Sequence, residues 1–445
     1  MNAKQFVIKK SKSIRAFEIL KETEEEVRRY GDALSTRMAE MQKMAAALPQ
    51  IPRKTTFTFQ NVKRSIQKQS RKVFRTQIWM NETQLAEFAN GSMAACFGDE
   101  YLIYEDRRHP RIPRGELMLM SRIDKVIGER HQLNQSAEIY AAYDIPAQAW
   151  FGSEHSKNEI ALAGYLEMAL QPCGVLSAHL GTSLVHPEID FYFRNLDGEL
   201  TFFELPDLSG ETINVYGKMT STVVGADTIL QRFDFSLSMD ERLILSGNTV
   251  FGYFHPKAMA AQRGMESVET HQFPLTASEP LPVAWIHQRH GEQRALMIKE
   301  ATLYAAKANP QTIVGLYEID ANDWFFKAHF LHDPVMPGSL GIEAATQLME
   351  LYAINKYAGY NPEQLTFTPV TEEKVSWKYR GQILPDDNEM LVKVFIIDEI
   401  PDALDPNEVK IIASAEVWKD TTKIYEISNI QYLAKMAEIE HGARL

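Results

Sequence analysis

Two long apolar stretches dominate the hydrophobic pattern of the chain. They run from about residue 160 to 177 and from 338 to about 358. In the first, Glu167 and Gln171 are the only charged or amide side chains between Ile160 and Leu176. Apolar runs of this length with so few polar groups predict two buried α-helices.

Shorter segments with β-type composition surround each predicted helix. Two of them precede the first helix and two precede the second, and a longer series follows each helix; the segments are 116–125, 137–144, 189–204 and 211–254, then 294–298, 312–318, 364–384, 389–399 and 408–432. Strands, a long buried helix and an antiparallel meander, occurring twice, predict an α+β double hotdog fold. Each antiparallel sheet wraps a long helix in this fold, and the two repeats form a side-by-side pseudodimer.

The pattern divides the chain into four parts. Residues 1–50 form a charged helical extension, with an apolar stripe that suits either a docking helix or a solvated linker helix. Residues 51–265 form the first hotdog with a basic leading segment, 266–282 a linker, and 283–445 the second hotdog. In the second half, the segment 323–326 is followed by a loop that leads into the second helix.

Composition narrows the class of protein. The chain has 445 residues, 45% of them hydrophobic, and no continuous apolar run of the length that a membrane span needs. Its start lacks an apolar signal core, so we expect a cytoplasmic protein. With Cys96 and Cys173 as the only cysteines, a disulfide scaffold is excluded. The net charge of −12 argues against nucleic-acid binding.

One basic segment stands out in this acidic chain. Residues 51–79 contain eight Lys or Arg and no Asp or Glu. The segment is either a solvated strand and loop or a docking face for an acidic partner. A second candidate patch consists of Arg107, Arg108, Arg111 and Arg114.

The segment before the second helix carries the most informative residues. Pro334 and Pro337 stiffen the loop and end any earlier helix, and Gly338 begins the next one with its N–H unpaired. His329 lies nine residues before Gly338. A base that titrates near neutral pH, beside amides that stabilise an enolate oxygen, is what removal of a proton α to a thioester needs.

The two helices supply candidate acids. Glu167 and Gln171 are four residues apart and so share one helix face, and Glu343 and Gln347 repeat that spacing. Burial on so apolar a helix raises the pKa of a carboxyl and keeps its acid form available to protonate a leaving hydroxyl. The alternative is that each glutamate lies on an exposed rim.

The motif that runs from His329 through DPVMPG to Gly338, Glu343 and Gln347 resembles that of the bacterial 3-hydroxydecanoyl-ACP dehydratase family. It is more similar still to the tandem dehydratase domains of polyunsaturated fatty acid synthases, and the resemblance covers roughly residues 88–435. It implies dehydration of 3-hydroxyacyl-ACP to 2-enoyl-ACP, with double-bond isomerisation left open. Acyl carrier protein is the implied partner, with ketosynthase or other synthase subunits as further partners and a homodimer left open.

The resemblance also implies roles for residues. His329 would be the base, Gly338 the oxyanion donor, and Pro337 and Ser339 would contact substrate. In that family the histidine works with the acid of the neighbouring hotdog, which pairs His329 with Glu167, oriented by Gln171. Single-domain members usually have Asp where this chain has Glu.

The crossed site would pair His155 with Glu343 and Gln347. His155 aligns with His329 when residues are counted from Trp150 and Trp324, but it is two residues out of register when they are counted from the helix glutamates. Residues 158–165 also lack the proline stiffening. We therefore expect this second site to be degenerate.

The histidines show no ligand spacing, so we expect no metal and no cofactor. Two other functions compete with the dehydratase: a non-catalytic hotdog scaffold of a synthase complex, and an acyl thioesterase. A buried tunnel at His329 would argue against the scaffold. Thioester hydrolysis needs a carboxylate or an activated water and does not explain the proline-stiffened loop.

Overall fold

The computed structural model describes residues 78–147, 149–152, 160–265, 278–290, 295–304, 311–359 and 361–437. The predicted helical extension, the basic run as far as residue 77, and His155 lie outside these ranges. No helix in the described ranges is both long enough and apolar enough to cross a bilayer.

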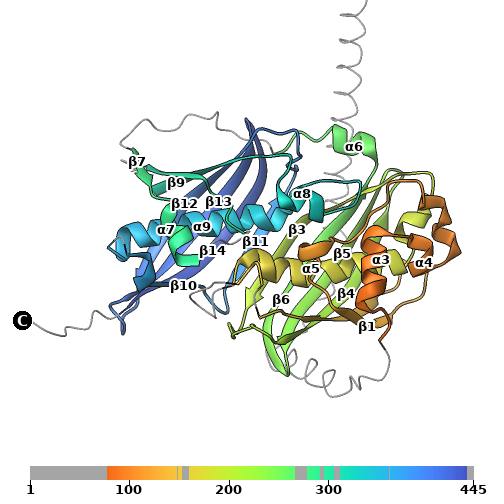
Figure 1. The fold of residues 1–445 in the computed structure, drawn as a ribbon, viewed down its shortest axis with the longest axis horizontal. Helices are drawn as coiled ribbons and strands as arrows, with labels where there is room; N and C mark the ends of the chain where they lie inside the picture. Colours follow the sequence, from red (N-terminus) through yellow and green to blue (C-terminus); the bar gives the residue numbers. More distant parts are fainter. Residues whose placement is uncertain are drawn as a thin grey trace, which may run out of the picture.

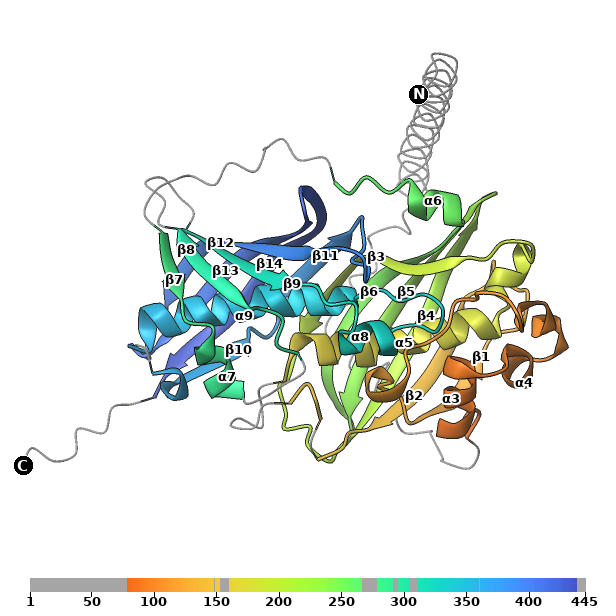
Figure 2. The same cartoon turned by 45° about the horizontal axis from the view of Figure 1, so that its top comes forward.

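The two apolar stretches form the central helices. Helix α5 spans Leu162–His179 and α9 spans Gly338–Tyr357, each within two residues of the predicted ends. Every residue from Ser339 to Ile354 is buried. A helix that is apolar on all sides is stable only when it is enclosed. Figures 1 and 2 show both helices on the same side of the sheet, α5 over the strands of the first half and α9 over those of the second.

The strands of the first half follow the order β1-β2-β4-β5-β6-β3, and those of the second continue as β11-β14-β13-β12-β9-β8-β7, with β10 paired to β14. Read outward from the seam, the two halves have the same order of strands, so that β3 corresponds to β11, β6 to β14, and so on as far as β1 and β8. The strands are β1 Arg122–Ile127, β2 Ala137–Asp144, β3 Tyr192–Phe202, β4 Thr212–Val224, β5 Thr228–Met239, β6 Arg242–Phe254, β7 Ser278–Leu281, β8 Glu300–Tyr304, β9 Gln311–Glu318, β10 Leu365–Pro369, β11 Lys374–Tyr379, β12 Glu389–Pro401, β13 Glu408–Lys419 and β14 Thr422–Met436. Two antiparallel sheets, each wrapped on one helix, form a double hotdog, as the sequence predicts.

The halves meet where β3 pairs with β11. Lys374 lies opposite Thr201 and Trp377 opposite Gly198, which joins the two sheets into one of 14 strands. A Cβ on Gly198 would lie 2.1 Å from the Trp377 ring, so only glycine admits this approach. The Trp377 Nε1–H donates to the Asn195 side chain across the seam (2.8 Å).

Shorter helices occur between these elements. They are α3 Glu82–Asn90, α4 Met93–Phe97, η1 Asp99–Tyr104, η2 Gly115–Leu117, η3 Thr182–Val185, α6 Pro256–Ala260, α7 Ala284–His290, α8 Trp324–Ala328 and η4 Pro362–Gln364. In Figure 1 the α3 and α4 helices lie at the end of the first half that is distant from the seam.

Three local predictions were wrong. The strand expected at 116–125 begins only at Arg122, because residues 115–117 form the η2 turn. The strand expected to start at 294–298 starts at Glu300. The end of the expected linker, 278–281, is strand β7, which pairs with β8. Each error concerns a short segment whose conformation depends on tertiary contacts more than on local pattern.

Candidate active site at the seam

A cavity of about 110 Å³ lies at the seam between the halves. The first half contributes residues of α5 and β3, and the second half contributes the loop before α9, the start of α9, and strands β11 and β14. The lining residues used below are Ile112, Glu167, Gln171, Gly174, Phe193, Arg194, His329, Gly338, Ser339, Tyr379, Gln382 and Tyr425.

Glu167 is buried on the face of α5 that borders this cavity, with 9% of its surface exposed. Its carboxylate accepts a hydrogen bond from Ser339 Oγ of the other half at 2.6 Å and one from Gln171 Nε2 at 2.9 Å. Burial raises the pKa of Glu167, and these two donors partly oppose that rise. The result is a carboxyl that is biased toward its acid form and held across the seam.

Gln171 is fixed by the backbone before β1. Its Oε1 accepts from the Leu119 N–H at 2.8 Å, and its Nε2 donates to the Leu117 carbonyl at 2.7 Å. These contacts settle the orientation of the amide, so that its Nε2 faces Glu167. The η2 turn, which the sequence pattern did not predict, provides the carbonyl that aims this side chain.

His329 follows directly after α8 and borders the same cavity as Glu167. Its Nδ1 lies 2.8 Å from the Val335 carbonyl. Because a carbonyl only accepts, Nδ1 carries the proton in the neutral ring and Nε2 is the basic nitrogen. Burial lowers the pKa of His329 to about 4, so the ring is neutral at physiological pH.

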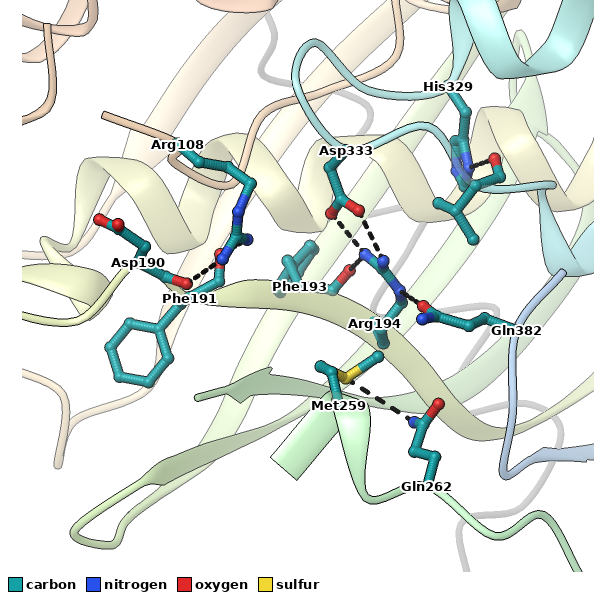
Figure 3. Close-up of polar contacts among 11 residues, drawn as sticks. Arg108, Asp190, Phe191, Phe193, Arg194, Met259, Gln262, His329, Asp333 and Gln382 are labelled. Atoms are coloured by element: carbon teal, nitrogen blue, oxygen red, sulfur yellow. Dashed lines mark hydrogen bonds and ion pairs between the residues drawn. The ribbon is translucent and has the colours of Figure 1, made fainter. Parts of the chain in front are cut away.

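The loop after His329 is anchored from two directions. Asp333 accepts two hydrogen bonds of 2.7 Å from the guanidinium of Arg194 on β3. Arg194 also donates to the Gln382 side chain at 2.9 Å, and the Met336 N–H donates to the Ile383 carbonyl at 3.0 Å. Figure 3 shows Arg194 of the first half reaching Asp333 below the His329 loop. The fork geometry of arginine makes this a rigid bridge between the halves.

Gly338 begins α9 against the ring of Tyr379. A Cβ at this position would lie 2.8 Å from Tyr379 Cε2 and Cζ, so a side chain does not fit. The first amides of a helix have no intrahelical acceptor, and the positive end of the helix dipole lies there. The start of α9 is therefore suited to binding a carbonyl oxygen that gains negative charge.

The other half repeats the acid network without the rest of the site. Gln347 accepts from the Met297 N–H at 3.0 Å and donates to the Ala295 carbonyl at 2.7 Å and to Glu343 at 3.2 Å. Glu343 accepts from the Ala163 N–H at 3.3 Å. The cavity beside it measures about 40 Å³.

This second cavity lacks two features of the first. Helix α5 begins with Leu162 and Ala163 where α9 begins with Gly338 and Ser339, so the small residue and the hydroxyl are both missing. Neither glutamate lies on an exposed rim, since Glu343 is also buried. His155, the predicted base of this cavity, lies outside the described residues.

The second candidate basic patch is not an open face. The guanidinium of Arg111 is buried and donates to the Phe88 carbonyl, and Arg108 binds the Phe191 and Asp190 carbonyls. Arg107 forms an ion pair with Asp190 and Arg114 donates to the Lys327 carbonyl. Arginines that hold loops in place in this way are poorly available to a partner.

Other candidate chemistry does not appear in the described residues. They contain no group of three or more His, Cys, Asp or Glu side chains placed to hold a metal ion. Cys96 and Cys173 are free thiols, and burial raises the pKa of Cys96 to about 11, which makes it a poor nucleophile.

The class that the fold and the site define is therefore a double hotdog protein with a histidine, a buried acid and a helix start at one seam cavity. Residues 292–428 match the family model described as the FabA-like domain. The resemblance found in the sequence is thereby confirmed.

One relative extends the similarity beyond this domain. The chain is 30% identical over 393 residues to a polyunsaturated fatty acid synthase subunit of Thraustochytrium sp., an alignment that covers 79% of this chain and 26% of the relative. The chain thus spans about a quarter of the length of that relative.

Solved structures with related folds are more distant. GphF dehydratase 1 is 12% identical, with a TM-score of 0.39 over 70% of this chain and 98% of that chain. A bifunctional dehydratase-cyclase domain of ambruticin biosynthesis is 13% identical, with a TM-score of 0.37 over 72% and 96%. An acyl-CoA thioesterase II of Mycobacterium marinum is 12% identical, with a TM-score of 0.31 over 59% and 87%. Similarity at this level does not distinguish between these activities.

Sequence reasoning missed two side chains of the site. Arg194 and Tyr379 lie on strands, where the alternation of polar and apolar residues gives no reason to expect a functional side chain. The sequence analysis therefore assigned no role to either residue. For Arg194, the one local indication is that this arginine directly follows a buried phenylalanine of β3. The sequence around Tyr379 gives no such indication.

Proposed function

We propose that this chain dehydrates 3-hydroxyacyl thioesters to 2-enoyl thioesters, with the acyl group carried on an acyl carrier protein. The observation that carries the proposal is the meeting of Glu167 from one half with His329, Gly338 and Ser339 from the other at one cavity. A hydro-lyase of a FabA-like family needs a base, an oxyanion donor and an acid at these places.

His329 acts as the base in this mechanism. Its Nε2 takes the proton from the carbon next to the thioester carbonyl, and its Nδ1–H remains bound to the Val335 carbonyl. The negative charge moves to the thioester oxygen, where the Gly338 N–H stabilises it. Pro337 and Ser339, on either side of Gly338, shape the contact with the thioester.

Glu167 acts as the acid. Protonated Glu167 donates its proton to the β-hydroxyl, which leaves as water while the double bond forms between the α and β carbons. The products are one water and one enoyl thioester, with His329 protonated and Glu167 ionised. Transfer of one proton from His329 to Glu167, directly or through water, restores the enzyme. No cofactor takes part.

The carrier and the pathway belong to the proposal as well. The relative is named as part of a polyunsaturated fatty acid synthase. We therefore infer a role in fatty acid or polyketide-type lipid synthesis in the cytoplasm, alongside ketosynthase or other synthase subunits. The basic run at residues 51–79 is the candidate docking face for the acidic carrier.

The test is direct. The protein is incubated with 3-hydroxyacyl carrier proteins of several chain lengths, and loss of one water is followed by mass spectrometry. His329→Ala is the matched variant, and we expect it to lower turnover by about 10²–10⁴-fold. A folded His329→Ala protein with near-normal turnover, or wild-type protein inert toward every substrate, would exclude the proposal.

A further inference from the structure

Tyr379 brings a polar group to the cavity that the mechanism above does not use. It is the last residue of β11, it is 8% exposed, and it lines the cavity together with Glu167 and Gly338. Within the ranges that the structure describes, its hydroxyl has no hydrogen-bond partner. The fully enclosed side-chain atoms without a partner in the described residues are those of Tyr165, Asn355 and Gln431, so the Tyr379 hydroxyl is not sealed off but opens onto the cavity, where a ligand can accept its hydrogen bond.

The position of this hydroxyl is specific. A Cβ on Gly338 would lie 2.8 Å from Tyr379 Cζ and 3.2 Å from its Oη, so the hydroxyl stands directly beside the first residue of α9. The ring is held from the other side by Tyr425, at a centroid separation of 4.5 Å. The Tyr379 hydroxyl therefore lies next to the residue whose amide begins α9, and both residues line the cavity.

We propose that the Tyr379 hydroxyl donates a hydrogen bond to the thioester carbonyl oxygen, as a second oxyanion donor beside the Gly338 N–H. This inference rests on the proposed dehydratase function and adds a catalytic residue to it. With a single donor, the remaining lone pairs of the enolate oxygen must be solvated by water, whereas two donors fixed by the fold stabilise it without reorganisation.

The protonation state of Tyr379 fits this role. Burial, followed by the nearby Tyr425 and Glu167, raises the pKa of Tyr379 well above its usual value. The phenol therefore keeps its proton over the working pH range and acts as a hydrogen-bond donor, and the acid that gives up its proton remains Glu167.

Two assays on Tyr379→Phe test the proposal. The first is dehydration of a 3-hydroxyacyl carrier protein, where we expect kcat to fall by about 10²–10³-fold, the usual cost of one oxyanion donor. The second is exchange of the α-hydrogens of a saturated acyl-pantetheine in D₂O, followed by mass spectrometry. This substrate has no leaving hydroxyl, so exchange reports enolate formation alone, and we expect it to slow by a similar factor.

Tyr432→Phe is the matched control. Tyr432 is equally buried, at 6% exposure, and lines the second cavity with Glu343, so its variant removes a hydroxyl from the wrong half. We expect both of its rates to stay within about threefold of wild type, close to 0.6 kcal/mol.

Three results would overturn the inference. Slower dehydration with unchanged exchange would place the Tyr379 hydroxyl on the leaving group instead of the carbonyl. Unchanged rates in both assays would remove it from the reaction. Wild-type protein that neither dehydrates nor exchanges would instead overturn the proposed function, together with the inference that rests on it.

Discussion

At the scale of single residues, burial shifts the pKa values of the proposed acid and the proposed base in opposite directions. Desolvation raises the pKa of the Glu167 carboxyl and lowers that of the His329 imidazole to about 4. Both shifts favour the neutral forms near pH 7, which is the state that elimination needs: a neutral base and a protonated acid. At ordinary pKa values the carboxyl would be ionised and the imidazole partly protonated.

Ser339→Ala provides a pH test of this tuning. The Ser339 hydroxyl stabilises the ionised form of Glu167, so its removal raises the pKa of that carboxyl further. In the proposed mechanism, activity is lost at high pH as Glu167 ionises and at low pH as His329 is protonated. We therefore expect the alkaline limb of kcat/KM against pH to move upward in Ser339→Ala, while the acid limb stays near pH 4.

A Ser339→Ala alkaline limb that moves downward, or does not move, would show that Glu167 is not the group titrating there. Ser339→Cys, which retains a weak donor, serves as the intermediate case and should give a smaller shift.

At the scale of elements, the loop that carries His329 depends on a bridge from the other half. Asp333 and Arg194 each expose 11% of their side chains and form two hydrogen bonds of 2.7 Å. Removing one partner of a buried pair typically costs about 3–5 kcal/mol, because the other charge remains buried alone. We expect Arg194→Met to lower the free energy of unfolding by about that amount, and to lower kcat as the loop loses its anchor.

Arg380→Met is the control for this bridge. Arg380 also crosses the seam, to Asp197 at 2.8 Å, but its pair is more exposed and should contribute only about 0–1 kcal/mol. Chemical denaturation of the two variants, combined with steady-state kinetics, makes the comparison. Equal losses of stability and of kcat would show that the Asp333 bridge has no special role.

The two glycines of helix α5 indicate where the acyl chain of the substrate would lie. Gly164 is required by packing, since a Cβ there would meet Phe151 at 2.6 Å, whereas a Cβ on Gly174 would meet only Ile112 at 3.5 Å and Phe193 at 3.8 Å. A glycine in a helix costs about 1 kcal/mol relative to alanine. Gly174 therefore leaves space among apolar groups in a cavity wall, about 10 Å along the helix from Glu167 at 1.5 Å per residue.

We expect Gly174→Leu to discriminate against long substrates. The added side chain should lower kcat/KM for 3-hydroxydecanoyl carrier protein about tenfold relative to 3-hydroxybutyryl carrier protein, since overpacking costs roughly 1–3 kcal/mol. Gly174→Ala, which makes only ordinary contacts, should keep short-chain turnover. An unchanged ratio between the two substrates in Gly174→Leu would place the acyl chain elsewhere.

At the scale of the whole molecule, the duplication and both central helices could be predicted because each repeat carries the same local pattern, a long apolar helix with strands before and after it. Glu167 with Gln171 and Glu343 with Gln347 are visible four residues apart on apolar helices, and the chain folds them into matching networks. The burial of both glutamates follows from the same pattern.

What the sequence could not predict depends on contacts between distant segments. Arg194 and Asp333 are 139 positions apart, and the approach of Tyr379 to Gly338 depends on how β11 crosses the start of α9. Short elements such as η2 and α8 were also missed, because their local sequences suit a strand or a loop equally well.

For the whole molecule, the central proposal is that the pseudodimer has a single working site. The first half would supply its acid and the second half its base. Glu167 is bound to Ser339 at the helix start that follows the His329 loop, while Glu343 faces the start of α5, which has Leu162 and Ala163 in place of Gly338 and Ser339. The two glutamates are otherwise matched in burial and in their glutamine partners.

The most direct measurement is a paired kinetic comparison of Glu167→Gln and Glu343→Gln on a 3-hydroxyacyl carrier protein, with circular dichroism to establish that both proteins are folded. We predict that Glu167→Gln lowers kcat by about 10²–10⁴-fold and that Glu343→Gln changes it by less than about tenfold. An inactive Glu343→Gln beside an active Glu167→Gln would contradict the account.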